Sequence, residues 1–362
     1  MKVAIMGAGL SGLACAIILE QQGIYPTIFE KRSRVGDRFV NMENIFNILE
    51  RPVSDSLNYL KDTYGITLKP ISEVQEITAH SKNRKGHLKG NFGYSNIRGR
   101  HEDSFENQLL LKIKSQIIYN SQCSYNELLK DYSHIVIATG NGDDAASMKN
   151  YTQDLQVSII GATIGGEFNP SHISTWYNND FAPKGYGYLV PFSQSRAQIS
   201  IAYPEYTKED RIDKDELWSR FYQEVQEDVG NNLNITDNFS IKGYKVGICK
   251  KPKINNTYFT GNCFGAIMPA YGCGQIPAML TGIYAALDIC RKGSYDELTK
   301  PLRQSYEDSL VLRRGLEKLD NDKLDVLVSI LNRNLTSRAL DKSVEFNFLK
   351  LISKLLKPFI RD

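Results

Sequence analysis

Residues 2–14 read KVAIMGAGLSGLA, and this stretch decides the fold. Its apolar start is typical of a short, buried strand of a parallel sheet. The glycines Gly7, Gly9 and Gly12 follow, and a helical pattern continues to Gln22. In such a loop the first glycine allows a tight turn, the second lets the backbone approach a pyrophosphate, and the third lets the helix pack closely on the strand. The stretch therefore predicts a dinucleotide-binding βαβ unit.

The acidic residue that such a unit needs is Glu30, which ends a second apolar run about 20 residues beyond the glycines. Its carboxylate is expected to accept hydrogen bonds from ribose hydroxyls. The helix start presents free N–H groups and the positive end of the helix dipole to a phosphate. We therefore include Ser11, in the first helical turn, and Lys31, beside Glu30, among the predicted cofactor contacts.

The composition is that of an ordinary globular protein, with 362 residues, 41% hydrophobic and 23% charged residues, and a net charge of +3. This length allows about two domains. The small charge gives no reason to expect a nucleic-acid partner. The six cysteines contain no Cys-x-x-Cys pair and no disulfide-framework spacing, which favours a reducing compartment. We expect a cytoplasmic protein without a metal site, and no apolar run is long enough to cross a membrane.

A basic loop follows Glu30, and in it Arg38 is predicted to neutralise a cofactor phosphate. The apolar residues of 41–64 are spaced as in a helix. Residues 65–100 alternate weakly in hydrophobicity and contain several glycines, so they predict short strands and turns.

A later strand ends in the small residues Ala138, Thr139 and Gly140. Small residues at the carboxyl end of a parallel strand leave room for a ligand, and Gly140 is therefore a predicted cofactor contact.

Residues 151–250 predict a β-rich region with one helix near 213–229. Gly161, Gly165 and Gly166 follow an apolar run and could be mistaken for a second nucleotide-binding loop. We reject that interpretation because no helical period follows and no acidic residue ends a later strand.

The chain then contains Gly261-Asn262 and, a few residues later, the segment Pro269-Ala-Tyr-Gly272-Cys-Gly274. A long helix is predicted from Gln275 to about Lys292, with glycines before it that let backbone approach a flat ligand. From Tyr295 to the end the pattern is helical.

Together these motifs resemble the FAD-dependent oxidoreductases of the para-hydroxybenzoate hydroxylase-like fold, and most of all the geranylgeranyl reductase family. The first glycine loop, the strand end at Gly140 and the Gly261 to Gly274 segment are similar to motifs shared across that fold. The segment Tyr186-Gly-Tyr-Leu-Val-Pro-Phe192 is similar to the family's Tyr-x-Trp-x-Phe-Pro substrate pattern. The resemblance covers nearly the whole chain.

The sequence departs from the family pattern at several positions. Tyr188 stands in place of tryptophan, Val190 in place of phenylalanine, and Asn262 in place of the acidic residue expected to bind the ribityl chain. The family's Arg-x-x-Phe-Asp-x-x-Leu segment appears only as residues 105–109, with Arg100 displaced by two residues. Arg100 is carried over as a cofactor contact. These departures affect the prediction of the substrate more than the prediction of the cofactor.

The resemblance implies an α/β fold with a Rossmann-type FAD-binding domain at 1–150 and 251–294. It implies a β-rich substrate domain at 65–100 and 151–250 and a helical C-terminal region at 295–362. The remaining implied FAD contacts are Gly261, Asn262, Gly272 and Gly274.

The implied activity is reduction of carbon–carbon double bonds in a polyprenyl lipid or a related hydrophobic substrate. The reductant would be NAD(P)H or a reduced ferredoxin-type donor. Tyr186, Tyr188, Pro191 and Phe192 would form an apolar wall for the substrate; a core face, which alternating strand residues normally indicate, is the less favoured alternative here. No catalytic residue is identified; Tyr188, Tyr271 and Cys273 are candidates for the proton donor. A flavin-dependent monooxygenase or oxidase of a smaller substrate and a non-catalytic electron-transfer flavoprotein stay open as alternatives.

The C-terminal tail, residues 346–362, has an amphipathic pattern. At helical spacing Lys350, Lys354 and Lys357 fall on one side, and apolar residues fall on the other. Such a helix suits peripheral contact with the cytoplasmic face of a membrane. Docking of the same helix on the protein's own core is the equally weighted alternative.

Overall fold

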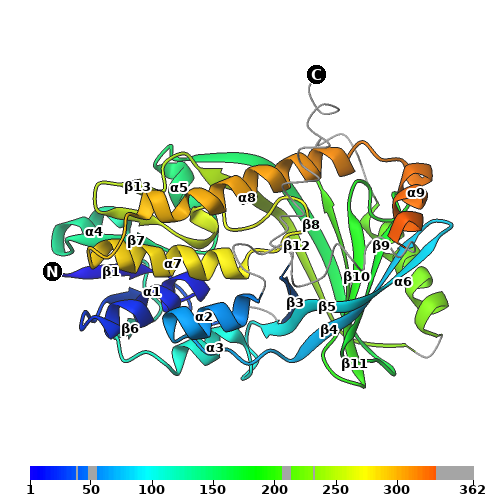
Figure 1. The fold of residues 1–362 in the computed structure, drawn as a ribbon, viewed down its shortest axis with the longest axis horizontal. Coiled ribbons are helices and arrows are strands. Elements are labelled where there is room, and N and C mark those ends of the chain that lie inside the picture. Colours follow the sequence, from blue (N-terminus) through cyan, green and yellow to red (C-terminus); the bar gives the residue numbers. More distant parts are fainter. Residues whose placement is uncertain (38–39, 48–54, 206–212, 231–232, 332–362) are drawn as a thin grey trace.

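The fold is built on two β-sheets, one mostly parallel and one mostly antiparallel (Figure 1). The computed structural model describes residues 1–37, 40–47, 55–205, 213–230 and 233–331. The predicted fold class, a Rossmann-type α/β region joined to a β-rich region and C-terminal helices, is confirmed. The domain boundaries drawn from the sequence stay a prediction.

The first sheet has six strands in the order β13-β14-β7-β1-β2-β6. All its neighbouring pairs are parallel except β13 and β14. The strands are β1 (Val3–Met6), β2 (Thr27–Phe29), β6 (Ile117–Ile118), β7 (His134–Ile137), β13 (Lys253–Ile254) and β14 (Thr257–Phe259). β1 is buried at every residue, as expected for a central strand of a parallel sheet.

Two helices lie against each other beside this sheet, α1 (Leu10–Gln21) and α7 (Gln275–Ile289) (Figure 1). Their backbones approach closely, because a Cβ atom on Gly282 would lie only 1.9 Å from the Ser11 carbonyl oxygen. This contact brings a helix from the end of the chain against the helix of the first glycine loop. The smaller helices of this half are α2 (Ser56–Tyr64), α3 (Phe105–Leu110), α4 (Tyr125–Asp131) and α5 (Asp143–Ser147).

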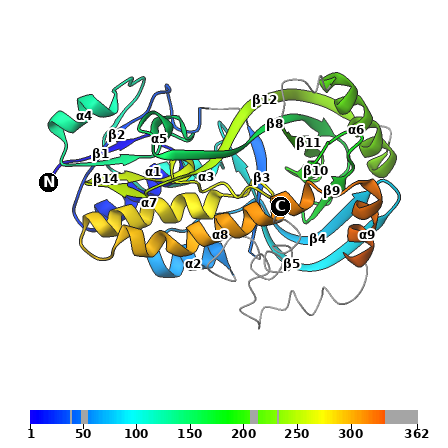
Figure 2. The same cartoon turned by 90° about the horizontal axis from the view of Figure 1, so that it is seen from above.

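The second sheet has eight strands in the order β12-β8-β11-β10-β9-β4-β5-β3. All pairs are antiparallel except β4 and β9. The strands are β3 (Asn41–Phe46), β4 (Ser72–Ser81), β5 (Lys85–Arg98), β8 (Tyr151–Gly165), β9 (His172–Tyr177), β10 (Tyr186–Pro191), β11 (Arg196–Pro204) and β12 (Asn234–Cys249). The long strands β8 and β12 run from the first half of the molecule into the second (Figure 2).

One face of this sheet packs on helix α6 (Lys214–Val229). Leu189, Ile199 and Ile201 form an apolar core with Phe221 of that helix. Successive strand residues point to opposite faces, so Tyr186, Tyr188 and the other alternate residues of β10 lie on the opposite face. That face is turned toward the first half of the molecule, because the Tyr186 hydroxyl donates to the backbone oxygen of Tyr271 at 2.7 Å.

The prediction of a helix over residues 41–64 was wrong for its first part. Residues 41–46 form β3, which pairs with β5, and among the described residues of this range the helix covers 56–64. In the sequence Ile45 is spaced with Ile48 and Leu49 as in a helix, but β3 has apolar neighbours on both faces, so Met42 and Ile45 are both buried in a strand. Residues 65–100 contain the long hairpin of β4 and β5 rather than the short strands that we expected.

The rejection of a second nucleotide-binding loop at Gly161 is confirmed. Gly161 and Gly165 both lie inside β8, paired with β11. A Cβ atom on Gly161 would meet the Phe239 ring at 2.2 Å, so this glycine makes room for an aromatic ring of β12.

Two C-terminal helices complete the described chain, α8 (Tyr295–Leu316) and α9 (Asn321–Leu331). α8 extends along both halves of the molecule, and α9 lies beside the β4–β5 hairpin (Figures 1 and 2). Asp325 of α9 accepts hydrogen bonds from Ser81 and Asn83 at the tip of that hairpin. The predicted amphipathic tail, residues 346–362, lies outside the described residues. In the described part of the chain no helix is both long and apolar enough to cross a bilayer.

Asp288 joins the ends of several elements. Its carboxylate accepts hydrogen bonds from Lys253 Nζ at 2.5 Å, the Tyr258 hydroxyl at 2.6 Å and the Tyr295 backbone N–H at 2.7 Å. Burial alone would raise the pKa of Asp288, but these donors lower it below its usual value. One carboxylate thus connects the edge of the first sheet, the end of α7 and the start of α8.

We expect Asp288→Asn to lower the free energy of unfolding by about 1.5–3 kcal/mol, because a charged acceptor of three donors is lost. Asp62→Asn, at an exposed position of α2, should change it by less than about 0.5 kcal/mol. Urea unfolding curves measure both. Because the folded-state pKa of Asp288 is lowered, its contribution is present at neutral pH and is lost as the pH falls through that value. Equal stability of the two variants at pH 7 would contradict this role.

Candidate functional site

The first glycine loop is fixed by close backbone contacts on two sides. Gly7 has a φ of +105°, and a Cβ atom on it would lie 2.4 Å from the Ala138 carbonyl oxygen. A Cβ atom on Gly12 would lie 2.1 Å from the Gly7 carbonyl oxygen. A Cβ atom on Gly9, by contrast, would meet nothing within 4 Å. The loop is therefore closed against the protein at Gly7 and Gly12 and open at Gly9, the position expected to face a pyrophosphate.

Glu30 lies directly beside this loop. Its carboxylate accepts hydrogen bonds from the backbone N–H groups of Ala8 at 2.8 Å and Arg32 at 2.9 Å. Each carboxylate oxygen has room for a further donor such as a ribose hydroxyl. Lys31 is exposed at the start of the next loop. Arg38, the predicted phosphate contact, lies outside the described residues.

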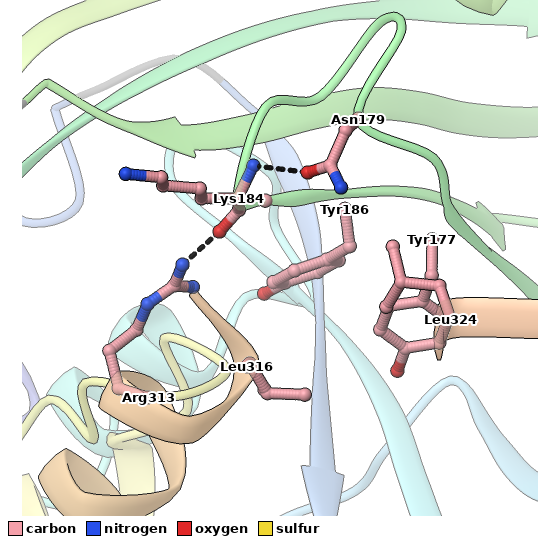
Figure 3. Close-up of a pocket in the computed structure, with 8 residues that line it drawn as sticks. Tyr177, Asn179, Lys184, Tyr186, Arg313, Leu316 and Leu324 are labelled. Atoms are coloured by element: carbon pink, nitrogen blue, oxygen red, sulfur yellow. Dashed lines mark hydrogen bonds between the residues drawn. The ribbon is translucent and has the colours of Figure 1, made fainter. Parts of the chain in front are cut away.

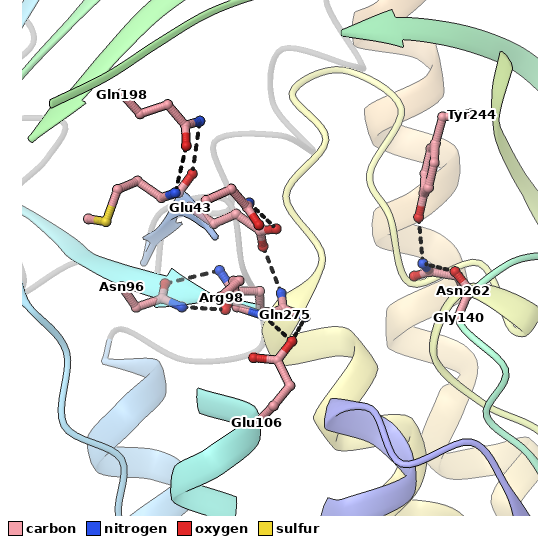
Figure 4. Close-up of polar contacts among 11 residues, drawn as sticks. Glu43, Asn96, Arg98, Glu106, Gly140, Gln198, Tyr244, Asn262 and Gln275 are labelled. Carbon is pink, nitrogen blue, oxygen red and sulfur yellow. Dashed lines mark hydrogen bonds and ion pairs between the residues drawn. The ribbon is translucent and has the colours of Figure 1, made fainter. Parts of the chain in front are cut away.

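The segment 261–263 reaches the same loop from the other end of the chain. A Cβ atom on Gly261 would lie 2.7 Å from the Ser11 hydroxyl oxygen, and the Gly261 N–H donates to the Thr281 hydroxyl at 2.9 Å. The Asn262 side-chain amide donates to the Gly140 carbonyl oxygen at 2.7 Å and lies 2.6 Å from the Tyr244 hydroxyl (Figure 4). The structure thus brings together four of the predicted cofactor contacts, Ser11, Gly140, Gly261 and Asn262, and adds Tyr244.

The start of α7 is the second glycine-rich helix terminus of the site. Gly272 is exposed with a φ of +70°, and Gly274 precedes the first helical residue. The N-cap residues of the two helices, Gly9 and Gly274, have no side chain that could cap them. Both helix starts therefore direct backbone N–H groups and the positive end of the helix dipole toward the site.

A buried polar cluster adjoins the start of α7, and the sequence analysis missed it. Gln275, the first residue of α7, exchanges two amide hydrogen bonds with Asn96 of β5, at 2.8 and 3.1 Å. Two residues further along β5, Arg98 donates to Glu43 at 2.7 Å and to Glu106 at 2.8 and 2.9 Å (Figure 4). Burial alone would lower the pKa of Arg98, but the two carboxylates raise it, so the guanidinium stays charged.

Arg100, which we expected to contact the cofactor, lies apart from this cluster. Its side chain is 53% exposed and pairs with Asp37 at 2.9 Å, in the loop that follows β2. Arg98 holds the buried position beside residues 105–109 instead. Strand residues two apart share a face, so the displaced motif could have suggested either arginine.

The candidate substrate residues separate into two groups. Tyr186 lies in a set of tyrosines, with ring centroids 5.8 Å from Tyr271, 5.9 Å from Tyr188 and 6.3 Å from Tyr177. Beside this set is a cavity with room for about one water molecule, lined by Tyr177, Tyr186, Arg313 and five other residues (Figure 3).

The second group lies at the far end of β10. Tyr188 and Phe192 pack around a small apolar cluster that contains Met42 and Val190. Pro191, the last residue of β10, is buried as well. Tyr188 belongs to both groups and so connects Tyr186 with Phe192 along one face of β10.

The polar atoms of the candidate proton donors are held by neighbours. The Tyr188 hydroxyl interacts with Ser200 and Gln198, and burial raises the pKa of Tyr188 to about 12. Burial raises the pKa of Tyr271 well above its usual value. Cys273 lies at the α7 start with its sulfur 3.9 Å from the Tyr271 backbone oxygen. Both phenols therefore stay protonated at neutral pH.

Gln198 is a further residue that the sequence analysis did not single out. This side chain of β11 is 1% exposed, and it accepts from the Met42 N–H at 2.8 Å and donates to the Met42 carbonyl at 3.4 Å. It also donates to Ser200 at 3.3 Å. Gln198 thus ties the edge strand β3 to the middle of the same sheet.

Comparison with known proteins agrees with the site. Residues 5–44 match the family model described as an NAD(P)-binding Rossmann-like domain. A flavin-containing amine oxidase of Danio rerio is 27% identical over 97 residues, which are 25% of this chain and 19% of that protein. The matched segment is thus about a fifth of the length of that curated relative.

The wider likeness comes from a solved structure. A geranylgeranyl bacteriochlorophyll reductase-like protein from Thermoplasma acidophilum superposes with a TM-score of 0.72 at 15% identity, and the match covers 98% of each chain. The protein has the fold of FAD-dependent oxidoreductases. A flavoprotein/dehydrogenase from Cytophaga hutchinsonii has a TM-score of 0.63 at 14% identity, covering 99% of both chains. The flavin-dependent halogenase CmlS has a TM-score of 0.67 at 11% identity, covering 99% of this chain and 70% of its own.

The residues of this flavoprotein fold fit FAD. The open space at Gly9 and the uncapped start of α1 suit the pyrophosphate, and Glu30 beside them suits the adenosine ribose. The N-terminus of α7, after Gly274, suits the electron-rich edge of the flavin ring. One buried acceptor, Glu106 Oε2, also lacks a protein partner. Among the described residues no group of histidine, cysteine or acidic side chains is arranged to bind a metal.

Gly9 and Gly12 offer a matched pair of substitutions. We expect Gly9→Ala to leave the free energy of unfolding within about 1 kcal/mol of wild type, because its Cβ enters open space. The same methyl group should weaken FAD binding at least about tenfold by occupying space needed by the pyrophosphate. Gly12→Ala should instead lower the free energy of unfolding by about 1–3 kcal/mol through its clash with the Gly7 carbonyl.

Thermal unfolding and fluorescence titration with FAD measure the two effects. Unchanged FAD affinity in Gly9→Ala would show that the pyrophosphate does not lie over this loop.

Proposed function

We propose that this protein is an FAD-dependent reductase of carbon–carbon double bonds in a polyprenyl lipid or a related hydrophobic substrate. The observation that carries the proposal is the meeting of the tyrosines of β10 with the glycine-rich start of α7. Tyr186 donates to the backbone of Tyr271 immediately before Gly272. The substrate face of the sheet and the helix terminus suited to the flavin are therefore in contact. The whole-chain likeness to a geranylgeranyl bacteriochlorophyll reductase-like structure supports this assignment.

When bound, FAD supplies the hydride that the reaction needs. The protein's own groups bind, orient and exclude water. The loop at Gly9, Ser11 and Glu30 would hold the adenosine diphosphate half, and the positive end of the α7 dipole would stabilise negative charge at the flavin. NAD(P)H or a reduced ferredoxin-type protein is proposed as the external electron donor.

Reduction of a double bond adds a hydride to one carbon and a proton to the other. Tyr188 and Tyr271 are the proposed sources of the proton, since burial keeps both phenols protonated. Tyr186, Pro191 and Phe192 are proposed to contact the apolar chain of the substrate.

A second candidate function is oxygen transfer to, or oxidation of, a smaller substrate. One observation favours it: the sheet face that bears Tyr188 also carries the buried polar side chains of Gln198 and Ser200. Such a face suits a substrate with a polar group better than it suits an apolar isoprenoid chain. The likeness to a flavin-dependent halogenase agrees with this alternative. An electron-transfer flavoprotein without a small-molecule substrate is the third candidate.

Anaerobic reduction of the bound flavin followed by addition of a geranylgeranyl lipid or of O₂ separates these functions. We expect the lipid to reoxidise the flavin rapidly and to be converted to the saturated lipid. Absorbance at the flavin maximum measures this reoxidation. Fast reoxidation by O₂ with an oxygenated product would favour the second function, and inertness to both would favour the third. Tyr188→Phe should slow the lipid step at least about tenfold if this phenol supplies the proton. Tyr25→Phe, at a position 61% exposed, should leave the rate unchanged.

We further propose that the protein contacts an anionic membrane surface, which would suit a lipid substrate. Helix α9, which precedes the tail in the sequence, exposes Val326 (62%) and Ile330 (48%), which are four residues apart and so lie on one side of the helix. We expect the protein to co-sediment with vesicles containing anionic lipid and to lose this binding when residues 346–362 are removed. Equal sedimentation of the truncated chain would contradict a role for the tail.

A further inference from the structure

Glu106 has one carboxylate oxygen without a hydrogen-bond partner among the residues that the structure describes. The residue is 3% exposed, and its Oε1 accepts from Arg98 Nε at 2.9 Å and from Nη2 at 2.8 Å. Its Oε2 is buried and makes no hydrogen bond in the structure. Buried carboxylate oxygens nearly always accept a hydrogen bond, and none of the described residues supplies a donor to this atom.

The position of Glu106 relates it to the proposed path of FAD. On one side the loop after β2 packs on it, since a Cβ atom on Gly36 would lie 3.5 Å from the Glu106 Cβ. That loop follows Glu30, the predicted ribose ligand. On the other side Arg98 and Asn96 share one face of β5, and Asn96 bonds to Gln275 at the start of α7. Glu106 thus lies between the elements that would hold the two ends of the cofactor.

The charges around Glu106 indicate which kind of donor fits. Arg98 is shared by Glu106 and Glu43, so two carboxylates face one guanidinium and the cluster has a net negative charge (Figure 4). A phosphate would be repelled there, whereas a neutral hydroxyl group is attracted as a donor. Hydroxyl groups are what the ribityl chain, in the middle of FAD, offers.

The opposite side of the site lacks the acidic residue that would otherwise take this role. Asn262 stands at that position, and its amide contacts are made with Gly140 and Tyr244. A ribityl hydroxyl therefore has no carboxylate acceptor at residue 262.

We propose that Glu106 Oε2 accepts a hydrogen bond from a hydroxyl group of the FAD ribityl chain, and that Arg98 is the positioning residue that orients this carboxylate. The proposal rests on the cofactor assigned in the proposed function. It makes Glu106 a cofactor-binding residue and gives the displaced motif at residues 105–109 a chemical role.

The test compares Glu106→Gln with Glu43→Gln by titration of the apoprotein with FAD and, separately, with ADP. Both substitutions remove one negative charge next to Arg98. They differ because both carboxylate oxygens of Glu43 already have protein donors, Asn41 Nδ2 at 2.9 Å and Arg98 Nη1 at 2.7 Å. Glu106→Gln keeps Oε1 for Arg98 and replaces the free oxygen by an amide nitrogen, which cannot accept.

We expect Glu106→Gln to weaken FAD binding about tenfold or more and to leave ADP binding unchanged. Glu43→Gln should change FAD affinity by less than about threefold. Deoxyribityl analogues of FAD add a second readout: wild type should lose affinity for one of them, whereas Glu106→Gln should not discriminate it from FAD. If Glu106→Gln fails to fold, Glu106→Asp is the second variant. It keeps the negative charge, but its shorter side chain moves the carboxylate oxygen away from the cofactor, so it should show the same selective loss of FAD affinity.

Three outcomes would overturn the proposal: equal effects of the two glutamine variants, parallel weakening of FAD and ADP, or unchanged binding of FAD by Glu106→Gln. These outcomes differ from failure of the proposed function, in which the wild-type protein itself would bind no FAD.

Discussion

The structure depends on backbone contacts that leave no room for a Cβ atom. Gly7 lies against Ala138, Gly12 against Gly7, and Gly282 against Ser11, with virtual Cβ positions 1.9–2.4 Å from a carbonyl oxygen. These contacts bring β1, β7, α1 and α7 together although they come from distant parts of the chain. Because packed backbones cannot yield as side chains do, the two helix starts are held in a fixed relation. These backbone contacts therefore fix the positions of the two helix starts in the site.

Local signals were enough to predict the parts of the fold that depend on these glycines. The first loop, Glu30, the strand end at Gly140 and the segment from Gly261 to Gly274 all have fixed spacings with a physical reason. The apparent loop at Gly161 could be rejected from sequence, since no helix pattern follows it. These features need only neighbours along the chain.

What the sequence could not predict depends on partners far away in the chain. Residues 41–46 are a strand because β5 pairs with them, and tertiary pairing overrides a helix-like spacing of apolar residues. The choice between Arg98 and Arg100 depends on which one meets Glu106 and Glu43 in three dimensions. Gln198 acts on Met42 across 156 residues, and no local pattern marks such a pair. The site's cofactor half was thus more predictable than its substrate half.

The bond from Gln198 to Met42 also bears on how the molecule folds. β3 is the last strand of the eight-stranded sheet, and an edge strand carries unpaired backbone groups that can pair with another chain. The Gln198 amide makes hydrogen bonds with both the N–H and the carbonyl of Met42. At this residue the backbone of the edge strand is therefore already paired within the protein. Contacts between residues so distant in sequence form late, because the intervening chain must be ordered first. We therefore expect the edge of β3 to stay open to association with other chains until β11 has joined the sheet.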